Sequence, residues 1–358
     1  MPVYVDELSD VIQSTQPLFM RRKWQDLSHT NQRYTVVSRQ FQGAKYGVSS
    51  GTKLSWRVQT SMTNSYQHIG TGAILNAAPA EQLDDCEVPW SLSAVSRAWY
   101  IDEVDHNSGP EAIVDILSVN INAMYGDLTT GEENSLWSAP ASSTEKPRKP
   151  MGIPFWIQKA SSGTASYSLG GGDPSGFTSG AAGLTVATAP QWKNGNFGYA
   201  DVSQNDLCVK LSEAMEKSYY EPPRSYASLE DSKPQFVLYT TYPVWEAFQS
   251  LQTSSNDNLG TDIGRFRNTV TFKGVPMTWV PALTNSGSPV RDTQHPIYGM
   301  DWSVFKMFFF TGWDWKMMPP ETPDNQPTAR KVYMIARRNY RCMSRRQLFV
   351  GHTTTFAQ

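Results

Sequence analysis

The strongest constraint on the fold is a helical repeat that begins at residue 108 and continues to about residue 137. Ser108 and Glu111 have capping-box spacing, and Pro110 lies near the first turn. Apolar residues then recur at helical intervals, at Ile113, Ile116, Leu117, Ile121, Met124 and Leu128. A helix of about 25 residues would be roughly 40 Å long. The pattern therefore predicts one helix that spans a whole domain.

Strand patterns surround this helix. Residues 52 to 60 alternate, with Leu54, Trp56 and Val58 on the inward face, and strand character returns at 90 to 101. The intervening residues are polar, so 34 to 101 is interpreted as a long hairpin whose tip has little core of its own. Later segments predict a helix at 204–218 and a strand at 235–242. A short helix is expected after Pro243, and a further strand at 275–281. The fold class expected is α+β.

Three further segments complete the interpretation of the chain. The apolar run 304 to 310 fits either a buried strand or a helix end. Residues 330 to 350 are interpreted as strands that return to the first region. Residues 160 to 183 are rich in glycine and serine, which is typical of a flexible loop.

Composition limits the class of protein. The 358 residues include 12 Trp, 16 Tyr and 15 Phe, which is far too aromatic for a disordered chain, and the net charge is only -2. Cys86, Cys208 and Cys342 form neither a disulfide framework nor a zinc motif, so a reducing compartment is expected. The acidic first residues do not resemble a signal peptide, and no segment approaches a membrane span. We expect synthesis in the cytosol and no membrane partner.

Motifs for catalysis, cofactors or metals are weak. GVSSG at 47 to 51 matches the nucleophile motif of hydrolases at Ser49, but a strand pattern follows where the motif needs a helix. No two histidines have metal-binding helical spacing, and Gly170 to Gly172 lack the context of a phosphate loop. We predict no catalytic residue, no cofactor and no metal site.

Charge is segregated at the C-terminal end. No acidic residue follows Asp324, whereas seven basic residues do: Arg330, Lys331, Arg337, Arg338, Arg341, Arg345 and Arg346. Either these residues pair with acids such as Asp102, Glu103 and Asp105, or some of them face a polyanion. Neighbours in a strand point to opposite faces, so at most about one arginine of each adjacent pair could face the same partner.

Several segments together resemble the major capsid proteins of tailed bacteriophages, which have the Hong Kong 97-like fold. They are PLFMRRKWQDL, GIPFWIQKA, PQWKNGNFGYADVS, NDNLG, VPMTWVPAL, PIYGMDWSVFK and RRQLFVGHT. The resemblance covers nearly the whole chain, and none of these segments is catalytic. It implies an N-terminal arm at 1–33 and an E-loop hairpin with flanking strands at 34–101. A peripheral domain with a spine helix would follow at 102–189, then an axial domain at 190–325 and return strands of the peripheral domain at 326–358.

The resemblance also implies a function. The expected protein is a structural capsid subunit that assembles as pentamers and hexamers around double-stranded DNA in the virion. Its expected partners are itself, a portal, a separate scaffolding protein and non-specifically bound DNA. Two departures from the family are expected to matter: the arm is too short for the built-in scaffolding segment that some relatives carry, and no lysine and asparagine can be matched to a cross-linking pair. A separate scaffolding protein and non-covalent locking are therefore left open. A carbohydrate-active or esterase-like hydrolase is the alternative.

Residue roles are expected on the same basis. Arg21, Arg22, Trp24 and Trp56 are expected to contact neighbouring subunits through the arm and the hairpin. Arg337, Arg338, Arg341, Arg345 and Arg346 are the candidates for facing DNA.

Overall fold

A computed structural model describes most of the chain. The described residues are 33–35, 45–60, 66, 68–71, 82–106, 116–160, 166–219, 235–254, 270–323 and 326–353. Arg21, Arg22, Trp24, the capping-box residues Ser108 and Glu111, and most of the predicted hairpin tip lie outside these ranges.

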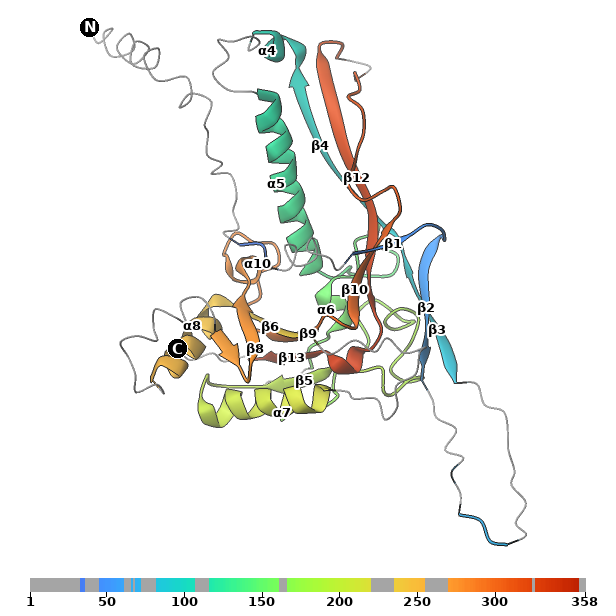
Figure 1. Ribbon diagram of the computed structural model, residues 1–358, viewed down its shortest axis with the longest axis vertical. Coiled ribbons are helices and arrows are strands. Elements are labelled where there is room, and N and C mark those ends of the chain that lie inside the picture. Colours follow the sequence, from blue (N-terminus) through green and yellow to red (C-terminus); the bar gives the residue numbers. More distant parts are fainter. Residues whose placement is uncertain are drawn as a thin grey trace.

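The first sheet is built on one long strand, β12 (Ala329–Cys342), which forms antiparallel pairs along both of its edges. β4 (Ser91–Tyr100) pairs with it from Tyr100 opposite Ala329 to Ser91 opposite Arg338. The other members are β1 (Lys45–Val48), β10 (Phe305–Phe310) and β11 (Lys316–Met317). The β4–β12 pair forms a long ribbon that extends away from the rest of the molecule (Figure 1).

Helix α5 (Ile116–Leu136) runs alongside this ribbon (Figure 1). Met124 and Leu128 pack against Val332 and Met334 of β12, because the apolar stripe of the helix meets the inward face of an alternating strand. A short helix, α4 (Ile101–His106), follows β4. The predicted long helix is thus observed as a 21-residue element, and its expected start at 108 lies outside the described residues.

The hairpin predicted within 34 to 101 is formed by β2 (Lys53–Gln59) and β3 (Leu83–Pro89). They pair antiparallel, from Lys53 opposite Pro89 to Gln59 opposite Leu83. Leu54 and Trp56 of β2 are buried, whereas their neighbours on the opposite face are exposed. The inward face was therefore predicted correctly for these two residues. A short helix, α6 (Ile153–Trp156), packs beneath this face within the same apolar cluster.

The second sheet has six strands in the order β5-β13-β9-β6-β8-β7. The strands are β5 (Gly195–Gly198), β13 (Phe349–His352), β9 (Ile297–Asp301), β6 (Phe236–Thr240), β8 (Val275–Trp279) and β7 (Val270–Phe272). Its helical elements are η1 (Gln204–Cys208), α7 (Val209–Ser218), α8 (Tyr242–Ser254), α10 (Pro281–Thr284) and η2 (Arg345–Gln347). Glycine is needed at Gly299, because a Cβ there would lie 2.2 Å from the Phe349 ring.

The strand pairing differs from the sequence expectation near the C-terminus. The ambiguous run 304 to 310 is strand β10, and it pairs with β12 although it lies within the range 190 to 325 assigned to the axial domain. Conversely, β13 pairs with β5 and β9 of the second sheet although the return strands were expected in the first region. All four residues of β13 are buried, as are all four residues of the neighbouring edge strand β5. The chain therefore crosses between the two sheets twice after residue 300.

Candidate functional site

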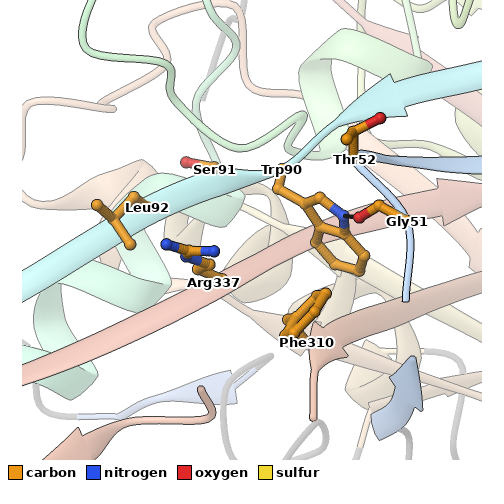
Figure 2. Close-up of a pocket in the computed structure, with 7 residues that line it drawn as sticks. All are labelled: Gly51, Thr52, Trp90, Ser91, Leu92, Phe310 and Arg337. Carbon is orange, nitrogen blue, oxygen red and sulfur yellow. Dashed lines mark hydrogen bonds between the residues drawn. The ribbon is translucent and has the colours of Figure 1, made fainter. Parts of the chain in front are cut away.

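An open groove lies where the hairpin meets the long ribbon. It has a volume of about 620 Å³ and is lined by Gly51, Thr52, Trp90, Ser91, Leu92, Phe310 and Arg337. Figure 2 shows the aromatic rings of Trp90 and Phe310 on one side of Arg337 and the side chain of Leu92 on the other. None of the described residues that line the groove is a histidine, a cysteine or a carboxylate, so these residues offer no acid–base pair for catalysis.

Local chain geometry fixes the aromatic wall of the groove. Gly51 has φ +110, a conformation that side chains with a Cβ rarely adopt, and it allows the turn between β1 and β2. Its carbonyl oxygen accepts a hydrogen bond of 3.0 Å from the indole N–H of Trp90. The Trp90 ring meets Phe310 edge to face, with the centroids 5.9 Å apart. The wall is therefore held by a turn, a hydrogen bond and a ring contact.

Arg337 supplies the charge of the groove. The residue is exposed, and its guanidinium carbon lies 4.5 Å from the centroid of the Trp313 ring. Leu92, its partner across the β4–β12 pair, is 57% exposed. An arginine beside an exposed leucine and two aromatic rings is suited to contact a surface that is both apolar and anionic.

Trp56 lies in the core of its own chain, not at a subunit surface. It is 8% exposed, and its ring centroid is 6.1 Å from that of Trp156 in α6. Leu54, Cys86 and Val88 belong to the same cluster. The expected contact of Trp56 with a neighbouring subunit is therefore not supported, because its ring is used to attach the hairpin to the body of the subunit.

Arg338 is also inside the fold. Its side chain is 3% exposed and forms an ion pair with Glu132 of α5, whose side chain is 1% exposed. The guanidinium carbon lies 5.1 Å from the centroid of the Trp315 ring. Burial lowers the pKa of Arg338 from its usual value. Arg338 therefore has no surface toward DNA and instead connects the spine helix to β12.

Arg345 is fully buried and binds backbone and amide oxygens. Its Nε donates to the carbonyl of Trp156 at 2.8 Å, Nη1 donates to that of Trp192 at 3.0 Å, and Nη2 donates to that of Gly172 at 2.8 Å. Nη2 also lies 3.3 Å from Oδ1 of Asn194. Burial lowers the pKa of Arg345 to about 10, which leaves it charged at neutral pH. This arginine holds the glycine-rich segment against the second sheet.

The glycine-rich segment is consequently packed where it is described, from residue 166 onward. Gly171 donates its N–H to the carbonyl of Asn194 at 3.1 Å, and a Cβ at Gly171 would lie 1.8 Å from the Asn194 side-chain oxygen. Ala181 is fully buried. Composition suggested a flexible loop, but at Gly171 the absence of a side chain is what allows the backbone to pack against Asn194.

The remaining candidates do not form one patch. Arg341 is half-buried, with its guanidinium carbon 4.6 Å from the centroid of the Phe308 ring. Arg346 is exposed in η2, which adjoins β5 of the second sheet, whereas Arg337 lies on the outer face of β12. In each adjacent pair one arginine is buried and the other is exposed, and strand alternation accounts for this in β12 at Arg337 and Arg338. The five arginines do not converge on a single polyanion surface.

Two histidines, His352 in β13 and His295 just before β9, are expected to make stability depend on pH. Burial lowers the pKa of His352 and of His295 below the usual 6.5, and nearby Lys159 acts in the same direction on His352. The unfolded chain therefore binds more protons than the folded chain at pH below about 6.5, so stability should fall as the pH falls through this window. For one histidine the folding constant can change by at most about tenfold per pH unit. Denaturant midpoints between pH 5.5 and 7.5 measure the slope, and His352→Asn should reduce it. A slope unchanged in that variant would contradict the assignment.

Other sequence motifs fit structural roles. The chain passes from β1 through Ser49 directly into β2, so the strand-to-helix turn of G-x-S-x-G hydrolases does not form. Within the described residues, no group of three histidine, cysteine or carboxylate side chains could hold a metal ion. None of the helices described there is both long and apolar enough to cross a membrane. The segment NDNLG lies outside the described residues.

Comparison with known proteins identifies the fold. No protein-family model matches the sequence, and no curated protein matches it significantly. Among solved structures, the chain is similar to the cyanophage A-1(L) capsid asymmetric unit, with 12% identity and a TM-score of 0.61 over 94% of this chain and 97% of that chain. It is similar to Gordonia phage Cozz, with 11% identity and a TM-score of 0.56 over 98% and 94%. It is also similar to the capsid of a native GTA particle, with 11% identity and a TM-score of 0.54 over 92% and 95%.

The chain therefore has a phage capsid-protein fold. More specifically, it has the mixed α and β architecture of the Hong Kong 97-like capsid proteins. The fold expected from the sequence segments is confirmed.

Proposed function

We propose that this chain is a structural subunit of a phage-type capsid and that it assembles with copies of itself into a closed shell. The observation that carries the proposal is the extent of the structural similarity, which covers 94% of this chain and 97% of the cyanophage capsid chain. The whole subunit shape is alike, not a shared subdomain. The groove at the base of the hairpin is lined by aromatic rings, a leucine and an arginine, which suits a binding surface better than a catalytic site.

The shape of the subunit supports assembly in rings. The hairpin and the β4–β12 ribbon project in different directions from the second sheet (Figure 1). Extended projections let a subunit contact its neighbours head to tail, and such contacts close into rings when the rotation permits. The GTA capsid was determined with C5 symmetry. We propose pentamers and hexamers for this chain, with domain limits at residues 33, 101 and 189. The expected limit at 325 does not match the sheets, because β10 belongs to the first sheet and β13 to the second.

The further partners belong to the same proposal. The shell would enclose double-stranded DNA, join a portal and use a separate scaffolding protein, after synthesis in the host cytoplasm. Arg346 and the half-buried Arg341 remain the candidates for DNA contact, and such contacts would be non-specific and salt-dependent. Arg21, Arg22 and Trp24 remain candidates for contacts of the arm with a neighbouring subunit. No observation favours the hydrolase alternative.

The proposal predicts the particle size of the purified protein. Expressed with and without a candidate scaffolding protein, it should give megadalton shells or ring-shaped capsomers. Size-exclusion chromatography with light scattering measures the mass, and negative-stain microscopy shows the shape. A monomer or small compact oligomer under both conditions, at concentrations well above those of virion assembly, would contradict the proposal.

A further inference from the structure

We propose that the groove at the base of the hairpin binds the acidic N-terminal segment, residues 1 to 12, of a second copy of this chain. This inference rests on the proposed function, because it describes a contact between subunits. The groove was defined above by Gly51, Thr52, Trp90, Ser91, Leu92, Phe310 and Arg337.

The first argument is the chemistry of the groove. Leu92 is 57% exposed beside the rings of Trp90 and Phe310, which is apolar area that a partner would cover. Among the described residues, Arg337 has no carboxylate within ion-pair distance. Its contact with Trp313 holds the guanidinium group in place, and a planar guanidinium can bind a carboxylate through two N–H donors. The groove therefore fits a ligand that presents apolar side chains next to a carboxylate.

The second argument is the composition of the N-terminal segment. It carries Asp6, Glu7 and Asp10, and no lysine, arginine or histidine occurs before Arg21. Apolar residues lie among these acids, at Val3, Val5, Leu8, Val11 and Ile12. The segment and the groove thus complement each other both in charge and in the close placement of apolar and ionic groups.

The third argument concerns where the arm joins the subunit. The Tyr34 hydroxyl lies 2.9 Å from Oγ1 of Thr130, Thr35 donates to Glu133 at 3.2 Å, and Arg33 lies over the Trp279 ring. These contacts fix the base of the arm on α5 and β8, which do not line the groove. About 20 residues separate the acidic segment from Arg33, a length that could span up to roughly 70 Å when extended. A segment that leaves one subunit and docks into a groove of the next makes the head-to-tail contact that a ring requires.

A charge exchange between copies tests the proposal. The first variant is Arg337→Glu, and the second combines Asp6→Lys, Glu7→Lys and Asp10→Lys in the full chain. Each variant alone brings like charges together, so each should raise the concentration needed for assembly by about tenfold, measured by light scattering. In an equimolar mixture every contact between unlike copies is complementary. The mixture should therefore assemble within about threefold of the unchanged chain.

Controls separate docking from folding and from other partners. Arg291→Glu changes an exposed arginine that lies outside the groove and has no proposed binding role, so it should leave the assembly concentration unchanged. Circular dichroism and denaturant midpoints should match for Arg337→Glu and the unchanged chain. A mixture that assembles no better than the separate variants would show that the segment does not dock into the groove of another copy, and this result would overturn the proposal. If Arg337→Glu assembled normally but its shells retained less DNA at raised salt, Arg337 would be assigned to contact with a polyanion. That result would also overturn the docking proposal.

A binding measurement separates this inference from the proposed function. A labelled synthetic peptide of residues 1 to 14 should bind the full-length protein in fluorescence anisotropy, and Arg337→Glu should weaken binding at least fivefold. The peptide with lysine at positions 6, 7 and 10 should not bind. If no shells form under any condition but the peptide binds in this way, the shell proposal fails and the docking surface stands. If shells form and the peptide does not bind, the docking proposal fails.

Discussion

Replacing Glu132 by leucine should lower the free energy of unfolding by about 3–5 kcal/mol. The change leaves the guanidinium of Arg338 buried without its carboxylate, and an uncompensated buried charge costs about this amount. The partners are 1% and 3% exposed, so water cannot take over the role of the carboxylate. Denaturant titration of the soluble subunit, followed by tryptophan fluorescence, measures the effect.

A double substitution and a surface pair act as controls. Glu132→Leu combined with Arg338→Met removes both charges and should recover most of the lost stability, because apolar residues of similar volume can replace a buried ion pair. Arg97 and Asp127 join the same helix to β4, but their side chains are 39% and 55% exposed. Asp127→Asn should therefore cost less than about 1 kcal/mol. Equal losses for Glu132→Leu and Asp127→Asn would show that burial does not set the importance of the inner pair.

The sequence contains a pattern that points to a buried ion pair between Glu132 and Arg338. Glu132 continues the helical stripe of Met124 and Leu128 at intervals of four residues, so it lies on the core face of α5. Arg338 continues the buried alternation of Val332, Met334 and Ala336 in β12. Opposite charges that each interrupt an apolar stripe predict a buried pair if the two stripes face each other. The sequence alone does not show that they do, because that depends on the packing of α5 on β12.

The burial of Trp56 likewise shows that a sequence pattern predicts which face of an element is buried but not what covers it. Period-two alternation predicted that Trp56 faces inward, and it does, because a half-buried hairpin needs one apolar face. The pattern does not identify what covers that face. The cover is Trp156 of the same chain, which is a hundred residues away in sequence. Hydrophobic periodicity gave the helices and strands of the fold, whereas the contacts of each face required the tertiary structure.

The groove illustrates a further limit of sequence patterns. Its wall combines Gly51 from a turn, Trp90 from the junction of two strands, and Phe310 and Arg337 from distant strands. No local motif links these positions, so the sequence predicted an exposed arginine in this region without predicting the aromatic wall beside it. The wall follows from the pairing of β10 and β12, which brings residues 305 to 309 opposite 338 to 342.

The crossings of the chain explain why the domain ranges and the sheets do not coincide. β10 lies in the first sheet and β13 in the second, so the segment between residues 305 and 352 belongs to both. The turn between β12 and β13 contains η2, and Arg345 lies in it. Adjacent arginines in a basic tail were expected to alternate as in a strand. A helical turn instead directs Arg345 into the core at the point where the two sheets meet.

Replacing Arg345 by leucine should therefore destabilise the subunit strongly, whereas the same change at Arg346 should have little effect. Arg345 is fully buried, and its guanidinium group donates to the carbonyls of Trp156, Trp192 and Gly172. Leucine would leave these buried acceptors without donors, at about 1–3 kcal/mol for each unsatisfied group, so a total of several kcal/mol is expected.

Arg346→Leu is the matched control, because it makes the identical chemical change one residue away at an exposed position. Its expected effect lies within about 0.5 kcal/mol. Denaturant midpoints compare the two variants, and limited proteolysis reads the local consequence. In Arg345→Leu, cleavage should appear first between residues 166 and 183, since Gly172 loses the donor that holds this segment to the second sheet. Similar midpoints for the two variants, or proteolysis that begins elsewhere, would show that the buried guanidinium is not what anchors the glycine-rich segment.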